Sequence, residues 1–97
     1  MNHAFHPDAE AEYLEAIAYY ETRKPGLGAA FIAEVEHFLA RVCDAPHRYP
    51  IDRQPDVRAI RLQRFPFKML FRDRNGVVEV LAIAHDRRRP AYWLGRH

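Results

Sequence analysis

Residues 65–85, FPFKMLFRDRNGVVEVLAIAH, contain the pattern that decides the fold. Between Phe67 and Arg72, large apolar side chains recur at every second position, which is the period of a half-buried β-strand. Asn75-Gly76 is the strongest short signal for a tight turn between two antiparallel strands. The nearly continuous apolar run over residues 77–84 is typical of a strand covered on both faces. This stretch therefore predicts a β-hairpin at the centre of a sheet.

A further strand is predicted at residues 57–62, where Ile60 and Leu62 share one face, with residues 63–66 as the turn into the hairpin. Successive side chains on a strand point to opposite faces, so burying the apolar face exposes the other one. The cations of that opposite face are Arg61, Lys68 and Arg72. We expect them to form a cationic surface that faces an anionic or acidic partner.

Two helices are predicted ahead of the sheet, over residues 8–24 and 27–45, because apolar residues recur there with the helical period. Lys24-Pro25-Gly26 separates them and makes them an antiparallel hairpin. Their combined apolar stripe needs a sheet to cover it. The polar side chains expected on the solvated faces are Glu10, Glu12, Glu15, Glu21, Glu34, Glu36, His37 and Arg41.

The two remaining segments complete the predicted order of elements. Residues 1–6 are expected to form a short opening strand, and Pro7 is a favourable first residue for the helix that follows. Residues 44–56 carry three prolines and little periodicity, so we expect an extended connector. The predicted fold class is α+β, a β-α-α-β-β-β sandwich with the helical hairpin packed on one face of a small antiparallel sheet. We expect one domain, residues 1–97.

Composition excludes several classes of protein. With 48% hydrophobic and 12% aromatic residues, the chain lies outside the composition of disordered proteins. No stretch approaches the roughly 18 apolar residues of a membrane span, and the acidic first residues are unlike a secretory signal. The single Cys43 has no partner for an intramolecular disulfide. We therefore expect a cytoplasmic protein.

Charge is divided unevenly along the chain. Residues 1–45 hold three basic and eight acidic side chains, a net charge of −5, whereas residues 46–97 hold twelve and five, a net charge of +7. Most of the cations are arginines, whose planar guanidinium suits phosphate and carboxylate. The division favours an anionic partner for the second half of the chain.

Most catalytic motifs are absent from the sequence. There is no HExxH, no glycine-rich phosphate loop and no GxSxG, and the single cysteine excludes a thiolate metal site. With one threonine and no serine, only Cys43 is a ready nucleophile, and its place in the second helix indicates a packing residue. We expect no metal and no cofactor.

The segment His85-Asp86-Arg87-Arg88-Arg89-Pro90-Ala91-Tyr92-Trp93 carries the remaining chemistry. Arginines next to aromatic rings suit phosphate contacts, base stacking or an acidic peptide. Tyr92 and Trp93 either contact a partner or pack the tail onto the edge of the sheet. His85 either moves a proton or is structural.

A resemblance to a known family rests on features that extend over essentially the whole chain. They are residues 9–21, Pro25-Gly26-Leu27-Gly28, Phe31, Pro46, Arg64-Phe65-Pro66-Phe67, Phe71-Arg72, Val80–His85, Arg87-Arg88 and Pro90-Ala91-Tyr92-Trp93. In their order and spacing the chain resembles the RelE/ParE superfamily of bacterial toxins from type II toxin–antitoxin systems. The resemblance implies the β-α-α-β-β-β sandwich. It also implies a cognate antitoxin, whose flexible segment folds across the sheet and helices.

The resemblance leaves two targets, because RelE-like members cut messenger RNA in the ribosome and ParE-like members poison DNA gyrase. Arg61, Lys68 and Arg87 match cations of the RelE-type site, but Ala59 stands where that branch has another basic residue. Phe65-Pro66-Phe67 and the histidine-arginine-proline tail resemble the ParE-like members more closely. Inhibition of gyrase and growth arrest are therefore favoured. A ribosome-dependent ribonuclease is the alternative, and a non-toxic homologue that only binds its antitoxin is a third.

The expected partners are therefore an antitoxin and DNA gyrase, or the ribosome and mRNA in the alternative, with no membrane. The expected oligomeric state is either a homodimer or a toxin–antitoxin heterooligomer. The residues expected to bind partners are Arg61, Lys68, Arg72, Arg87, Arg88, Tyr92 and Trp93. If the chain is a ribonuclease, its catalytic residues are Arg61, Lys68, His85, Arg87 and Tyr92.

Overall fold

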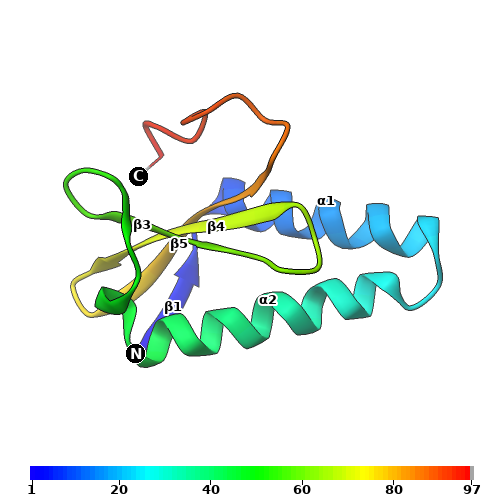
Figure 1. Ribbon diagram of the computed structural model, residues 1–97, viewed down its shortest axis with the longest axis horizontal. Coiled ribbons are helices and arrows are strands. Elements are labelled where there is room, and N and C mark those ends of the chain that lie inside the picture. The colour runs from blue at the N-terminus through cyan, green and yellow to red at the C-terminus, as the bar shows by residue number, and fades with distance from the viewer. Residues whose placement is uncertain (97) are drawn as a thin grey trace.

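The structure, a computed structural model, describes residues 1–96 and consists of two helices packed on one face of a five-stranded sheet (Figure 1). The strands lie in the order β1-β5-β4-β3-β2 across the sheet. The elements in chain order are β1 (Asn2–Phe5), α1 (Pro7–Arg23), α2 (Leu27–Asp44), the 3₁₀ helix η1 (Pro46–Arg48), β2 (Ile51–Arg53), β3 (Val57–Arg61), β4 (Phe67–Arg74) and β5 (Val77–His85).

The predicted α+β sandwich is confirmed, and the sheet differs from the expectation in two respects. β1 pairs in parallel with β5, so the sheet is mixed and not purely antiparallel. The expected connector also contains η1 and β2, whose Ile51 pairs with Arg58 of β3. Pro46 is the first residue of η1, and Pro50 and Pro55 flank β2, so no proline interrupts either element. Three strand residues are too few to show a period.

The helix-facing side of the sheet forms the main core. Phe31, Val35 and Val42 of α2 are at most 1% exposed and pack against apolar side chains of β4 and β5. The predicted sheet residues of this core are confirmed as Ile60, Leu62, Phe67, Met69 and Phe71. Each large side chain buried in this way contributes about 1.5–3 kcal/mol, so this layer holds helices and sheet together.

Local signals fix the ends of both helices. Pro7 is the first residue of α1, and the His6 Nδ1 accepts the backbone N–H of Asp8 at 3.0 Å. At the start of α2, the Glu21 carboxylate accepts the backbone N–H groups of Gly26 and Gly28 at 3.0–3.1 Å. Glu21 is exposed, as expected, and its carboxylate also satisfies amides that have no partner inside α2.

A second acid of the helices is also engaged with the backbone. The Glu34 carboxylate accepts the N–H groups of Gln63 and Arg64 at 2.8 and 3.0 Å. It was expected on the solvated face of α2, yet it fixes the turn between β3 and β4 to that helix.

The central hairpin has the predicted turn and one irregularity. Asn75 and Gly76 both have positive φ, 55° and 81°, as a type I′ turn requires. The pairing of β4 with β5 shifts between Leu70 and Phe71, so Leu81 has no partner of its own in the register. The shift places Leu81 with Ala82 in the apolar cluster on the far face of the sheet.

Candidate functional site

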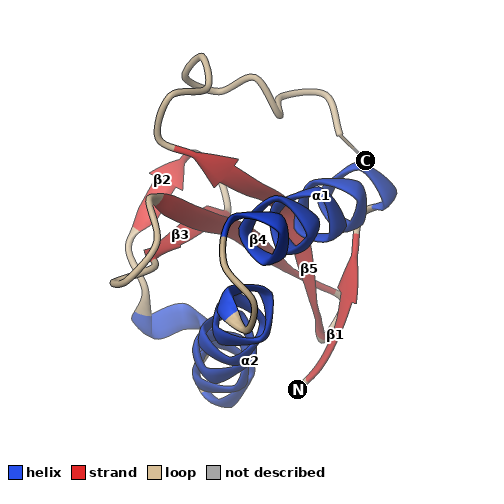
Figure 2. Ribbon diagram, turned by 90° about the vertical axis from the view of Figure 1, so that its right-hand side faces the viewer, coloured by secondary structure: helices blue, strands red, loops and turns tan. Residues whose placement is uncertain are grey.

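The chain after β5 crosses the side of the sheet that lies away from α2 (Figure 2). There Trp93 is 4% exposed and packs in a second apolar cluster with Leu70, Leu81 and Ala84. Trp93 therefore has almost no exposed surface in the free chain, and its contact with a partner stays a prediction. Of the two alternatives for this ring, packing of the tail onto the sheet is the one observed.

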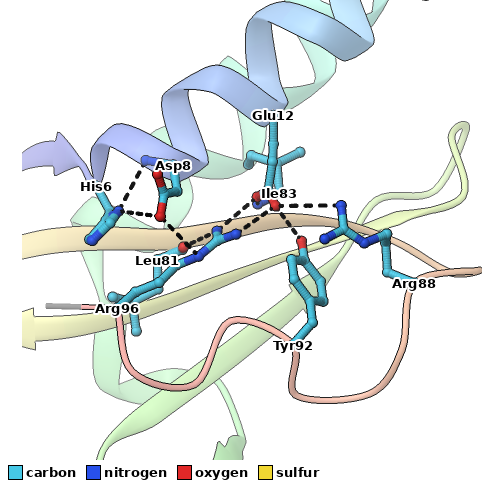
Figure 3. A network of polar contacts seen from close by, with 8 residues as sticks. All are labelled: His6, Asp8, Glu12, Leu81, Ile83, Arg88, Tyr92 and Arg96. Atoms are coloured by element: carbon cyan, nitrogen blue, oxygen red, sulfur yellow. Dashed lines mark hydrogen bonds and ion pairs between the residues drawn. The ribbon is translucent and has the colours of Figure 1, made fainter.

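The tail is held by a network centred on Glu12 of α1 (Figure 3). The Glu12 carboxylate accepts the Ile83 N–H at 3.0 Å, the Tyr92 hydroxyl at 2.7 Å and the Arg96 guanidinium at 2.9 and 3.1 Å. Arg96 also donates to the Leu81 carbonyl at 2.9 Å. Where β5 continues past its pairing with β1, its backbone groups are thus hydrogen-bonded by the side chains of Glu12 and Arg96. Glu12 was expected to be solvated, but its side chain is only 14% exposed.

Burial and the hydrogen bond to Glu12 raise the pKa of Tyr92 far above its ordinary value, so this hydroxyl stays a donor at neutral pH. The hydrogen bond to Glu12 likewise raises the pKa of the Arg96 guanidinium. The network therefore keeps the Tyr92 hydroxyl and the Arg96 guanidinium as hydrogen-bond donors to Glu12. Its role is to position the residues of the tail.

A cleft of about 400 Å³ lies between the far face of the sheet and this tail. It brings together most of the predicted site residues, but Arg72 and Arg87 do not line it. Those that do are Arg61, Lys68, His85, Arg88, Tyr92 and Trp93. The predicted positions of Arg61 and Lys68 on the face away from the helices are confirmed, and the two are direct neighbours in the β3–β4 register.

The expected cationic surface is largely neutralised by acids of the same chain. Arg61 is paired with Asp86, and Lys68 lies 3.2 Å from Asp52. Arg72 and Arg74 share Glu79, at 2.9 and 3.4 Å. Because most of these side chains are partly or fully exposed, the pairs add little stability. They do change the electrostatics, since the sheet presents alternating charges in place of a uniform patch.

The arginine run of residues 87–89 carries positive charge that acids of the chain only partly match. In the described part of the chain, residues 1–96, neither Arg87 nor Arg89 has an acidic group within 4.0 Å. Arg88 stacks on the Tyr92 ring at 3.9 Å and lies 4.0 Å from Glu12. The run is therefore anchored at its centre and exposes a cation on either side.

His85 is the only histidine at the cleft, and its ring is already engaged. Its Nδ1 accepts the backbone N–H of Arg87 at 3.0 Å, and the ring packs edge-on against Phe67 at 5.0 Å. A neutral imidazole that accepts at Nδ1 carries its proton on Nε2. His85 thus offers the cleft a donor and no free base.

The sequence reasoning missed the acids that organise this site. Glu12 lies three residues after Ala9 and four before Ala16, both buried, so helical spacing alone places it on the packed side of α1. Asp52 lies on the strand that was not predicted, and Asp86 directly follows β5. Of the three, only Glu12 had a signal in the sequence that would have identified it.

Two further features can be stated for residues 1–96. No cluster of three or more His, Cys, Asp or Glu side chains is arranged to hold a metal ion. No helix in the same range is long and apolar enough to cross a membrane.

Comparison with known proteins decides the family. Residues 4–90 match the family described as the ParE toxin of type II toxin–antitoxin systems, parDE. The chain belongs to the ParE toxin family. The fold is also similar to a solved structure from a chromosomal ParDE toxin–antitoxin system of P. aeruginosa, with a TM-score of 0.76 and 18% sequence identity. That similarity covers 88% of this chain and 95% of the other. Among curated proteins, no sequence matches this one.

The match to the ParE family accounts for most of the chain, and it confirms the ParE-like side of the superfamily resemblance. The matched region ends at Pro90, within the segment that follows β5. Tyr92, Trp93 and Arg96, which fix that segment to the sheet and α1, lie beyond it.

Proposed function

We propose that this ParE-family chain arrests bacterial growth by inhibiting DNA gyrase and that a cognate antitoxin neutralises it. Membership of a toxin family supports growth arrest as the outcome. The observation that carries the choice of mechanism is the arginine run, where Arg87 and Arg89 lack acidic partners within residues 1–96 while Arg88 stacks on Tyr92. Two free guanidinium groups beside a fixed aromatic ring suit binding to a protein or nucleoprotein surface.

The polar groups at the cleft give little support to ribonuclease chemistry. Cleavage through the 2′-hydroxyl needs a proton acceptor, a proton donor and cations at the phosphate. His85 already accepts a hydrogen bond at Nδ1, and the Tyr92 hydroxyl donates to Glu12. Arg61 and Lys68 are paired with Asp86 and Asp52. Binding through exposed cations needs none of these groups to be released.

Induction of the chain in bacteria, followed by two assays on the purified protein, tests the proposal. We expect growth arrest on induction, relief of the arrest when the product of the adjacent gene is co-expressed, and inhibition of DNA supercoiling by purified gyrase. Ribosome-dependent cleavage of mRNA in the absence of any effect on supercoiling would reject gyrase as the target. Absence of growth arrest would identify a homologue that only binds its antitoxin.

His85→Ala is the matched variant for this experiment. Because the ring supplies no free base in this structure, we expect the variant to remain toxic and to inhibit gyrase as well as the original chain does. Loss of a general base typically lowers a rate by about 10²–10⁴, so a ribonuclease that uses His85 would lose its toxicity. A folded, harmless His85→Ala variant would therefore contradict the proposed mechanism.

A further inference from the structure

The cleft between the far face of the sheet and the tail has paired charges on its sheet side. Arg61 of β3 and Lys68 of β4, which we call the floor cations, are neighbours in the register and line the cleft together. Arg61 is paired with Asp86, and Lys68 lies 3.2 Å from Asp52. Both acids are lining residues as well. Two acids of the chain therefore occupy the positions at which an anionic ligand would contact the floor cations.

Both acids are held in place by the backbone. The Asp86 N–H donates to the Pro66 carbonyl at 2.9 Å, which fixes this residue to the turn ahead of β4. Asp52 is the middle residue of β2, between Ile51 and Arg53, which both pair with β3. A ligand that displaced the carboxylates from the floor cations could move them only by rotation of their side chains. Their negative charge would therefore stay at the cleft.

The two ion pairs matter more for electrostatics than for stability. The Arg61 side chain is 59% exposed and the Lys68 side chain 37%, so each pair is screened by water and stabilises the fold little. A phosphate group could break such pairs. It would then lie beside the carboxylates of Asp52 and Asp86, and like charges in contact oppose binding strongly. The acids therefore act as a barrier to anions at the floor cations.

Apart from these two acids, the cleft has the features of a site for single-stranded nucleic acid. Its volume of about 400 Å³ lies in the range of small-ligand sites, roughly 300–1,000 Å³, and admits one strand but no duplex. Arg53 and Arg89 line it and have no acidic group within 4.0 Å among residues 1–96. Arg88 stacks on the ring of Tyr92 beside them. Cations that alternate with aromatic rings along a groove suit the phosphates and bases of a single strand.

We propose that Asp52 and Asp86 are specificity-determining residues, which exclude RNA from the cleft by holding the floor cations Arg61 and Lys68. The inference rests on the proposed function, because it explains how a chain with this many arginines acts on gyrase without binding RNA in its cleft. Selectivity then comes from two acids of the chain and not from a shortage of cations. The arginine run, which lies outside their reach, stays available to the target.

Asp52→Asn/Asp86→Asn tests the proposal with a fluorescent single-stranded oligouridylate as the probe. The amides keep the shape of the acids and remove their charge, so that Arg61 and Lys68 become free to contact phosphates. We expect the double variant to bind the probe at least about tenfold more tightly than the original chain does. Two added contacts to a single strand should also steepen the slope of log K against log salt concentration by about 1.4. Fluorescence anisotropy at several salt concentrations measures both quantities.

Two further variants show whether the position of the acids is what matters. Asp44→Asn/Asp56→Asn raises the net charge by the same amount, but both residues are exposed and lie outside the cleft lining. We expect this control to bind the probe within about threefold of the original chain. Adding Arg61→Gln/Lys68→Gln to the first double variant should return its affinity to that of the original chain. Circular dichroism of each variant checks that the fold is retained.

The outcomes separate this inference from the proposed function. If the original chain binds the oligouridylate as tightly as the first double variant does, the acids exclude nothing and the inference is rejected, even where gyrase is inhibited. An equal gain in the control would assign the effect to total charge and also reject it, as would a gain that survives the loss of Arg61 and Lys68. If the original chain leaves supercoiling by gyrase unchanged, the proposed function is wrong. The binding comparison then still decides whether the acids exclude RNA.

Discussion

Glu12 shows how a single acidic residue connects three parts of the molecule. It lies on α1, accepts the backbone N–H of Ile83 on β5, and binds Tyr92 and Arg96 of the tail. The side chains of Glu12 and Arg96 are 14% and 13% exposed, so their charges are shielded from water and depend on each other. The position of the arginine run therefore depends on a residue far from it in sequence.

Replacing this carboxylate should be costly. We expect Glu12→Ala to lower the free energy of unfolding by about 3 kcal/mol, because it leaves the Arg96 charge, the Tyr92 hydroxyl and the Ile83 N–H without their acceptor. Glu15→Ala, on the exposed side of the same helix, should change stability by less than about 0.5 kcal/mol. Urea denaturation of both variants measures the difference. Equal stabilities would mean that the network does not hold the tail.

The contacts of individual side chains divide into those that sequence patterns predict and those that they do not. Phe31, Phe67 and Met69 were predicted to be buried because apolar spacing reports which face of an element is covered. The pairing of Arg61 with Asp86 depends on how a tail folds back after β5, and no local period encodes that. Predicting the positions of the cations was therefore possible, whereas predicting their neutralisation was not.

At the scale of the elements, the helical hairpin depends on the close approach of α1 and α2 at Gly28. A Cβ on Gly28 would lie 3.0 Å from the Ile17 carbonyl oxygen and 3.0 Å from both Cβ and Oε1 of Glu21. These contacts involve the backbone of α1 as well as the side chain that binds the N-terminal amides of α2. The start of α2 is therefore fixed against α1 by the absence of a side chain.

Gly28→Ala tests this close approach against helix propensity. In a free helix the change would add about 1 kcal/mol of stability, because alanine is the better helix former. Here we expect a net loss of about 1–3 kcal/mol, since the methyl group pushes the two helices apart. The thermal midpoint of unfolding measures the sign. A more stable variant would show that α1 and α2 separate at this point without penalty.

The elements also show why short strands were harder to predict than long ones. β4 and β5, with eight and nine residues, contain enough repeats to reveal their period and their turn. β2 has three residues between prolines, and it exists because β3 offers it a partner. The parallel pairing of β1 with β5 likewise depends on where the helical hairpin returns the chain, which its four residues do not encode.

At the scale of the whole molecule, the folded chain redistributes the charge division of the sequence. The second half carries a net charge of +7, but four of its sheet cations are paired with Asp52, Glu79 and Asp86, namely Arg61, Lys68, Arg72 and Arg74. Among residues 46–96, cations without an acidic partner remain at Arg87 and Arg89 of the arginine run, and also at Arg48, Arg53, Arg58 and Arg64. The fold therefore neutralises part of the positive charge that the sequence places in the second half.

Two double variants with the same net charge test whether toxicity depends on the position of the cations or on the total charge. Arg87→Ala/Arg89→Ala removes the free guanidinium groups, and Arg61→Ala/Lys68→Ala removes two paired cations of the cleft. Both lower the net charge by two, so long-range attraction to an anionic partner falls equally. We expect the first variant to lose growth arrest and most of the salt dependence of gyrase binding. The second should keep both, because its cations already interact with acids of the chain. If the second variant lost toxicity and the first kept it, the cleft between sheet and tail would be the working surface, in agreement with ribonuclease chemistry.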